Sequence, residues 1–363
     1  DGEYTDEWGG VDKLCMVALG YINYYKLTSE KLYVDKTVDI AKTVISHVKE
    51  GDESHSPLPF RVNFRSGEIL DPYCSNMILA IQLFDELLKL DSGISTSVLH
   101  QKRSVLWNWI LKYPMQNHWW SGYYEDVVSN YNNLNQQNAM ETARYILRNP
   151  EIDPDYKTDV PALIHWVEKR FGQTKRFGAT SIREQDGCFQ EMSSHTARYA
   201  SVVAMWYGVS QNPDDREEAR AAFALSTYSA YNRWSKNEMA INYTGIEYTD
   251  PWFSDSYWDY LSHYFDGMAE LPEMLPDNEN HLFYSSSTVT DIEYSDNRIS
   301  YRTFDPNGIE RIKLTFKPKV LVDGKEYSSE YWKFSTYRGV PDVLTIHRHN
   351  VKSIEILEGR IPD

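Results

Sequence analysis

Apolar residues recur at spacings of three and four over most of the chain, from about residue 9 to residue 272. This spacing places them on one face of a helix, and that face must be buried against a neighbour. The helical segments come in successive pairs: 11–25 with 31–48, 75–90 with 97–113, 135–147 with 159–171, and 191–208 with 216–234, with a further pair opening at 255–271. The pattern predicts a mainly α fold built from an array of helical hairpins.

A short repeat falls within this array. Thr-Ala-Arg-Tyr stands at 142–145 and again at 196–199, at the same place on the first helices of successive pairs. The residue before the repeat is Glu141 in one copy and His195 in the other. Because Glu and Arg three residues apart commonly pair on a helix, we interpret Arg144 as scaffold and the variable position as chemistry.

The hydrophobic pattern changes near residues 271–280. Beyond this point the period is two, and turn signals interrupt it at Asp-Pro-Asn-Gly (305–308) and Asp-Gly (323–324). Short strands of this kind predict a small antiparallel β-sandwich. We therefore expect a helical domain over 1–275 and a C-terminal β-sandwich domain over 281–363.

The charge of the chain excludes some classes of partner. The formal net charge is −16, and residues 281–363 carry 12 basic and 12 acidic side chains, so the whole excess lies in the helical part. An acidic surface repels nucleic acid, and no apolar run is long enough for membrane insertion. The three cysteines are widely spaced, and no metal or cofactor motif appears, so neither a metal nor a cofactor is expected.

Long loops rich in aromatic and acidic residues precede the first helices of the pairs. Long irregular loops usually carry function. Their candidate residues are Trp119, Trp120, Tyr124, Asp126, Asp250 and Trp252. Adjacent Trp side chains suit stacking on sugar rings, and carboxylates beside them suit acid–base chemistry. In the alternative interpretation, Trp119 and Trp120 fill a gap between hairpins.

The stretch 184–201 holds the other candidates. On a helix, Glu191, His195, Arg198 and Tyr199 stand at i, i+4, i+7 and i+8, so we expect them on one face. Polar groups there are costly to bury unless they are paired. In a functional interpretation His195 or Tyr199 carries a proton and Arg198 binds a carboxylate or hydroxyls. In a structural one, Glu191 supports His195 and Arg198 bonds a neighbouring loop.

Helical hairpins with aromatic, acidic loops and a trailing β domain resemble the (α/α) toroid carbohydrate-active enzymes. These are the six-hairpin glycosidase superfamily and the toroidal polysaccharide lyases, and the stretch DGCFQE (186–191) loosely resembles a lyase pattern. The likeness covers nearly the whole chain and is architectural, so it identifies no single family. About four and a half hairpins are visible, so we expect an incomplete toroid, or a complete one with helices upstream.

The resemblance and the residues together leave three functions open. The first is a glycoside hydrolase with paired carboxylates, for which the candidates are Glu7, Asp126 and Glu191. The second is a polysaccharide lyase that uses His195, Tyr199 and Arg198 for β-elimination. The third is a non-catalytic glycan-binding protein. In each case the partner is an oligosaccharide or polysaccharide.

The start of the chain bears on location. It opens with the acidic, turn-like stretch DGEYTDEWGG rather than with Met, so we expect processing or fragmentation upstream. Because glycan enzymes of the kind that it resembles are mostly exported, we expect a secreted or periplasmic protein.

Overall fold

The computed structural model describes residues 8–63, 65–122, 133–229 and 257–359. Contacts group the chain into two compact units. The helical unit comprises Asp1–Ile22 and Lys31–Tyr264, and the β unit comprises Asn23–Glu30 and Phe265–Asp363. The two units divide between Tyr264 and Phe265, before residues 276–280, which separate the two predicted domains. The domain boundaries at 275 and 281 stay a prediction.

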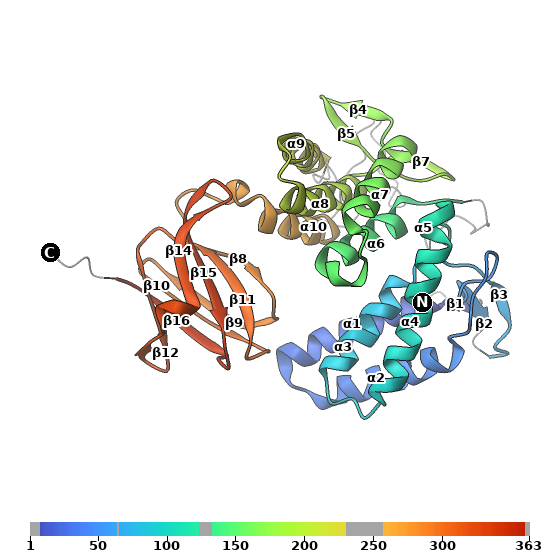
Figure 1. The fold of residues 1–363 in the computed structure, drawn as a ribbon, viewed down its shortest axis with the longest axis horizontal. Helices are drawn as coiled ribbons and strands as arrows, with labels where there is room; N and C mark the ends of the chain where they lie inside the picture. Colours follow the sequence, from blue (N-terminus) through green and yellow to red (C-terminus); the bar gives the residue numbers. More distant parts are fainter. Residues whose placement is uncertain (1–7, 64, 123–132, 230–256, 360–363) are drawn as a thin grey trace, which may run out of the picture. The chain divides into compact units, whose positions relative to one another are not determined.

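The helices follow the predicted pairs (Figure 1). They are α1 (Val11–Thr28) and α2 (Lys31–His47), α3 (Ile78–Lys89) and α4 (Thr96–Lys112), α6 (Gln136–Arg148) and α7 (Tyr156–Phe171), α8 (Ser193–Ser210) and α9 (Pro213–Ser229), and α10 (Tyr257–Glu270). A short helix, α5 (Pro114–Asn117), follows α4 directly. The helix expected from residue 191 begins instead at Ser193, because residues 188–191 pair as a strand.

The first helices of neighbouring pairs pack on one another, α3 on α6 and α6 on α8, and each also packs on its own second helix (Figure 1). Small residues that are almost completely buried on these first helices allow a close approach: Ala139 and Ala143 on α6, and Ala197, Ala200 and Ala204 on α8. The start of α6 is fixed by Asn135, whose side chain accepts a hydrogen bond from the backbone N–H of Asn138 at 2.9 Å.

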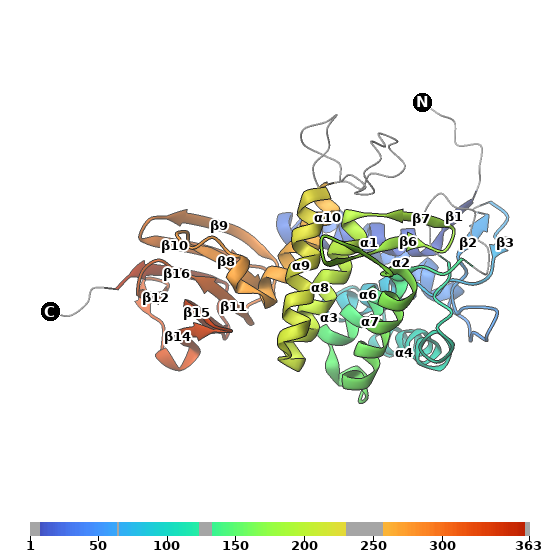
Figure 2. The same cartoon turned by 90° about the horizontal axis from the view of Figure 1, so that it is seen from above.

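Short strands occupy several of the loops that precede the first helices. β1 (Trp8–Gly10), β2 (Arg61–Asn63) and β3 (Ile69–Asp71) form one antiparallel sheet. Two antiparallel hairpins lie between α7 and α8, β4 (Thr174–Arg176) with β5 (Ala179–Ser181) and β6 (Arg183–Gln185) with β7 (Cys188–Glu191); Figure 2 shows them from above. Strands of three or four residues are too short to show an alternating pattern in the sequence.

The β unit contains two antiparallel sheets, with strand orders β13-β12-β16-β10-β9 and β14-β15-β11-β8. The strands are β8 (His281–Ser285), β9 (Val289–Ser295), β10 (Arg298–Thr303), β11 (Gly308–Lys313), β12 (Pro318–Val322), β13 (Lys325–Glu326), β14 (Trp332–Tyr337), β15 (Val340–Arg348) and β16 (Ser353–Glu358). Both sheets contribute to one apolar core, for example Ile299 and Ile356 from the first and Ile312 and Ile346 from the second. A shared core is what the predicted β-sandwich requires.

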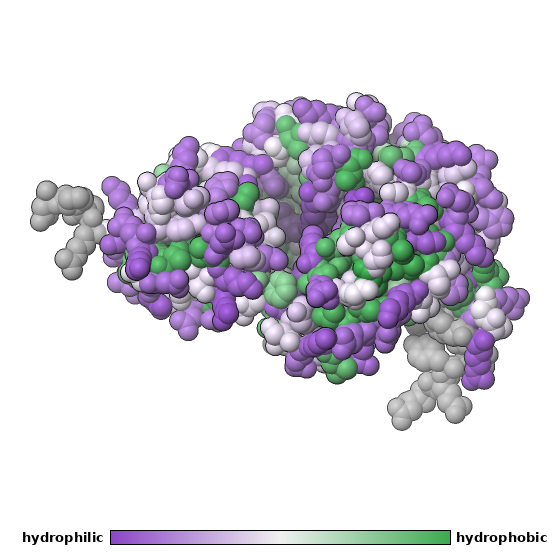
Figure 3. Space-filling model, turned by 60° about the horizontal axis from the view of Figure 1, so that its bottom comes forward, coloured by the Kyte–Doolittle hydropathy of each residue, from purple (hydrophilic) through white to green (hydrophobic). Residues whose placement is uncertain are grey.

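The surface agrees with the polar composition of the chain. Hydrophilic residues cover most of the visible face, and hydrophobic residues show between them (Figure 3). In the part of the chain that the structure describes, no helix combines the length and apolarity needed to cross a membrane.

Candidate active site

Buried polar side chains gather at the N-terminal ends of α1, α3, α6 and α8. Asp12 lies in the first turn of α1, and its Oδ2 atom lies 3.2 Å from the side-chain nitrogen of Asn76, just before α3. Asn138 of α6 donates to the hydroxyl of Ser75 at 2.7 Å. These residues are at most 5% exposed. We call this set, with Gln136 and His195 described below, the polar network.

A pair of arginines extends the network along α6 and α8. The Nε atom of Arg198 lies 3.1 Å from one carboxylate oxygen of Glu141, and the Nε atom of Arg144 lies 3.2 Å from the other. Burial opposes ionisation of Glu141, but the charges of Arg144 and Arg198 outweigh it and hold the pKa of its carboxyl below the usual range. Glu141 is therefore a carboxylate that two arginines share.

Each arginine also contacts a histidine. Nη1 of Arg198 lies 2.9 Å from Nδ1 of His195, and Nη2 of Arg144 lies 3.1 Å from Nδ1 of His263 on α10. A guanidinium group can only donate hydrogen bonds, so each Nδ1 atom must accept, which assigns the ring proton to Nε2. Burial, and next the positive charge of Arg198, lower the pKa of both imidazoles well below 6.5. Both rings are therefore neutral Nε2–H donors at pH 7.

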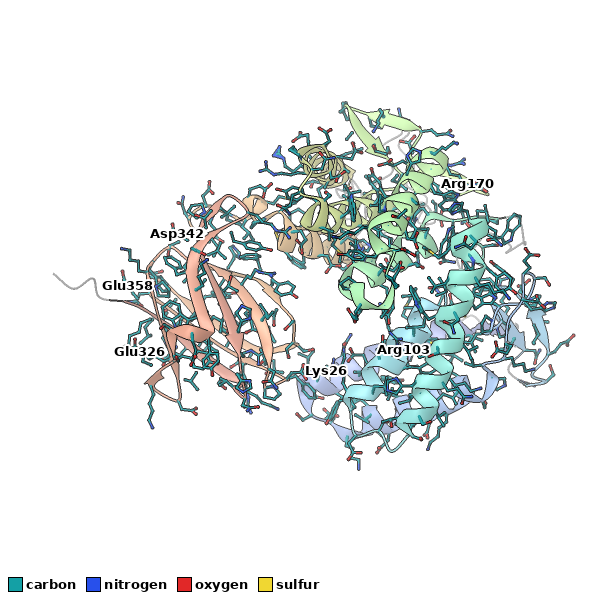
Figure 4. All side chains as sticks on the ribbon, viewed as in Figure 1. Lys26, Arg103, Arg170, Glu326, Asp342 and Glu358 are labelled. Carbon is teal, nitrogen blue, oxygen red and sulfur yellow. The ribbon has the colours of Figure 1, made fainter. Side chains whose placement is uncertain are left out.

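The repeat has a structural explanation. Its two arginines meet at Glu141, whereas its two tyrosines contact other helices. Tyr145 donates to Asp85 of α3 at 2.5 Å and accepts from Arg103, which Figure 4 shows on α4. Tyr199 donates to Glu168 of α7 at 2.6 Å. The repeat thus gives each of two neighbouring helices the same pair of contacts. One is from its arginine to Glu141, and the other is from its tyrosine to a carboxylate on another helix.

The expectation that four candidates share one helix face is wrong. Glu191 ends strand β7 and lies outside the helix. The side chains of His195 and Arg198 contact α6, whereas the hydroxyl of Tyr199 contacts Glu168 of α7 and Glu218 of α9. Burial and these two carboxylates raise the pKa of the Tyr199 phenol well above 10, so it is poorly suited to serve as a base.

Glu191 itself has strong partners. Its carboxylate accepts from Arg176 at 3.0 and 3.2 Å and from the hydroxyl of Ser181 at 2.7 Å. Burial opposes ionisation, but the hydrogen bonds from Arg176 and Ser181 outweigh it and lower the pKa of Glu191. This geometry favours a structural ion pair, and a catalytic role for Glu191 stays a prediction.

The tryptophans precede α6. Trp120 is completely buried, and its carbonyl accepts from the backbone and the side chain of Asn135. Trp119 is half-buried, and its carbonyl accepts from the hydroxyl of Tyr73 at 2.8 Å. For Trp120, this burial favours the interpretation in which it fills a gap. The remaining predicted site residues, Glu7, Tyr124, Asp126, Asp250 and Trp252, lie outside the described residues.

Six members of the site escape the sequence analysis as functional candidates: Asp12, Ser75, Asn76, Gln136, Asn138 and His263. Asp12 is notable because burial raises the pKa of its carboxyl, although hydrogen bonds from Asn76 and the backbone of Lys13 oppose the effect. Polar residues in a first helical turn normally serve as caps in water, so the spacing of Asp12, Gln136 and Asn138 alone gave no signal of burial. Among the described residues, no group of three or more His, Cys, Asp and Glu side chains could hold a metal ion.

Comparison with known proteins identifies the fold. No family model and no curated protein sequence matches the chain. Its structure is similar to that of the cellobiose 2-epimerase from Bacillus thermoamylovorans B4167, with a TM-score of 0.55 and 12% identity over 75% of this chain and 73% of that chain. A D-mannose isomerase gives a TM-score of 0.53 and 12% identity, over 75% and 74% of the two chains.

A GH76 α-mannanase from Bacteroides thetaiotaomicron gives a TM-score of 0.50 and 13% identity, over 72% of this chain and 69% of that chain. The similar structures are members of the six-hairpin glycosidase superfamily, so the predicted resemblance to (α/α) toroid enzymes is confirmed at the level of the fold. No single family is identified.

Proposed function

We propose that this chain is a carbohydrate-active enzyme whose reaction breaks a C–H bond next to a carbonyl or carboxyl carbon of the sugar, by isomerisation or elimination. The observation that carries the proposal is the cluster in which Arg144 and Arg198 share Glu141 and each hold one histidine in a single neutral form. Removing this proton needs a base, for which we propose the ionised carboxylate of Asp12 in the polar network, because burial raises its pKa and so strengthens it as a base. The electron pair of the broken C–H bond then places negative charge on the oxygen. Fixed N–H donors in a buried site stabilise such charge.

Each part of the cluster has a distinct role in this proposal. His195 and His263 donate Nε2–H to the oxygen on which charge develops, as preorganised neutral donors. Arg198 and Arg144 hold the rings in that tautomer through Nδ1. Glu141 fixes both arginines and balances one of their charges. The toroid fold is compatible with this chemistry, since the similar structures include an epimerase and an isomerase.

Glycoside hydrolysis is the second candidate, and Asp12 favours it. A carboxyl whose pKa is raised by burial stays protonated at higher pH and can protonate a leaving group. The carboxylate that would complete the pair comes from the predicted set Glu7, Asp126 and Glu191. Export of the protein to the periplasm or the medium stays part of this proposal.

The test is a panel of neutral and uronic-acid saccharides with three readouts. These are new reducing ends, the ultraviolet absorbance of an unsaturated uronate, and a change in sugar identity by chromatography. The proposal predicts a changed sugar, or absorbance together with reducing ends, and predicts that His195→Gln abolishes either signal. The matched control is His165→Gln on α7, whose side chain is 77% exposed and which should keep full activity.

Reducing ends alone would contradict the proposal and favour the hydrolase. Binding of a saccharide without any product would contradict both and favour the glycan-binding alternative.

A further inference from the structure

Several polar atoms at the start of α6 and α8, and one on Trp120 ahead of α6, are buried without a hydrogen-bond partner among the described residues. They are Oε1 of Gln136, Oε1 of Gln137, Oδ1 of Asn138, Oγ of Ser193 and Nε1 of Trp120. Each of these residues is at most 6% exposed. An unsatisfied buried polar group costs stability, so native proteins keep few of them, and five such atoms call for an explanation.

The amide groups of Gln136 and Asn138 have fixed orientations. The amide nitrogen of Gln136 must face Nδ1 of His195 at 2.9 Å, because Arg198 already makes that atom an acceptor. The amide nitrogen of Asn138 faces the carbonyl of Ser121 at 3.3 Å, which only accepts. In both cases turning the amide round would break an existing bond, so the carbonyl oxygen is left over.

Gln137 connects the leftover oxygens of Gln136 and Asn138 with Glu141 and its two arginines. Gln137, Glu141 and Arg144 stand at i, i+4 and i+7 on α6, so they follow one another along a single helix face. On either side of that face, Gln136 contacts α8 and Asn138 contacts the residues before α3. The leftover carbonyl oxygens therefore form an arc across the start of α6, one turn before the carboxylate that anchors both arginines.

The chemistry of this arc selects a ligand class. Amide oxygens accept hydrogen bonds, so they suit hydroxyl groups and repel a carboxylate. The hydroxyl of Ser193, at the start of α8, can both donate to and accept from such a hydroxyl group. From this geometry we infer that the arc is a subsite for the hydroxyl groups of a neutral sugar ring, and that a uronic acid is excluded from it. The inference rests on the proposed function and narrows it to isomerisation of a neutral sugar, because β-elimination needs the carboxyl group of a uronic acid.

The decisive variant is Gln137→Met, which keeps the side-chain length and removes the unpartnered oxygen. Because replacing an unsatisfied acceptor by an apolar group relieves its cost, the unfolding midpoint of this variant should be no lower than that of the wild type. The matched control is Gln185→Met. Gln185 is also fully buried, but its oxygen accepts from Asn133 at 2.6 Å and its nitrogen donates to Glu184 at 3.2 Å. The control should therefore unfold at a lower temperature.

Ligand binding is read from the rise in the unfolding midpoint with cellobiose, mannobiose or digalacturonate. We expect a rise with at least one neutral disaccharide and none with digalacturonate. In Gln137→Met the affinity for the neutral sugar should fall about 5- to 10-fold, the loss of one net hydrogen bond. Gln185→Met should keep the wild-type affinity.

A Gln137→Met protein that loses stability as the control does would overturn the inference, because the oxygen would then have a structural partner. Equal affinity of the variant for the neutral sugar, stronger binding of digalacturonate, or no rise with either neutral disaccharide would overturn it as well. These measurements need no turnover. The inferred subsite is therefore supported if the stability and binding measurements give the expected results while the product panel detects no reaction. It is overturned if those measurements fail while the panel detects a reaction.

Discussion

Replacing Glu141 with glutamine tests the cluster at its centre. The side chains of Arg144 and Arg198 are 4% and 7% exposed, that of Glu141 is 25% exposed, and both arginines point a nitrogen at this carboxylate. Removing one partner of a buried ion pair costs about 3–5 kcal/mol, since the remaining charge is left without compensation. Glutamine keeps an acceptor for one arginine, so we expect a loss of about 3 kcal/mol in the free energy of unfolding.

The matched control is Glu217→Gln on α9. Glu217 pairs with Arg220 at the same i,i+3 spacing as Glu141 with Arg144, but the two side chains are 72% and 46% exposed. An exposed pair of this kind contributes less than about 0.5 kcal/mol. Urea unfolding followed by far-ultraviolet circular dichroism measures both changes. Equal losses in the two variants would refute the reasoning that burial makes the Glu141 pairs costly to break.

The pH dependence gives a second check on the same variant. The folded-state pKa of Glu141 lies below its ordinary value of 4.5, so its contribution is complete above that pH and is lost as the pH falls through the folded value. The difference between the wild type and Glu141→Gln should therefore stay constant from neutral pH down to the ordinary value and shrink below it. A difference that grows in acid would contradict the assignment of an ionised Glu141.

Three further predictions follow from other contacts. Tyr199→Phe removes the hydroxyl that bonds Glu168 at 2.6 Å, so it should lower stability by about 1–2 kcal/mol and leave kcat unchanged; a loss of activity at full stability would restore Tyr199 as a base. In the β unit, Glu310→Gln breaks a pair with Arg348 in which both side chains are 0% exposed and should cost about 3 kcal/mol, whereas Glu293→Gln, 68% exposed beside Arg298, should cost less than about 0.5 kcal/mol in thermal unfolding. His195 and His263 have folded-state pKa values far below 6.5, so the unfolded chain binds more protons and stability falls as the pH drops from 6.5. The His195→Asn, His263→Asn double variant should show a shallower fall between pH 7 and about pH 5; an identical slope would show that the rings titrate alike in the folded and unfolded chain and would contradict their assignment as buried neutral donors.

The arrangement of helices could be predicted from the sequence because burial of one face imposes a period that persists over many residues. Helix α7, expected over 159–171, is observed at Tyr156–Phe171, and α4, expected over 97–113, is observed at Thr96–Lys112. The error at the start of α8 has a local cause, since Glu191 belongs to a β-hairpin too short to show its own period. Spacing alone could not reveal where the regular pattern begins.

The site was harder to predict than the fold. The sequence placed His195 and Arg198 together, and the structure brings Glu141, Arg144 and His263 to them through contacts between helices far apart in the chain. His263 stands 119 residues from Arg144, which it contacts, and a contact between residues so far apart leaves no local pattern in the sequence. The repeat gave the useful signal, because equivalent arginines on adjacent helices converge on one point.

The most direct test of the proposed chemistry is the fate of deuterium in a substrate labelled at the carbon next to its carbonyl or carboxyl group. The substrate is whichever saccharide of the panel the wild type converts, and mass spectrometry of the products gives the label content. Isomerisation or elimination breaks this C–D bond, so the account predicts products that have lost the label to solvent, in a reaction that His195→Gln abolishes. Products that retain the label in full would contradict it and move the chemistry to a pair of carboxylates.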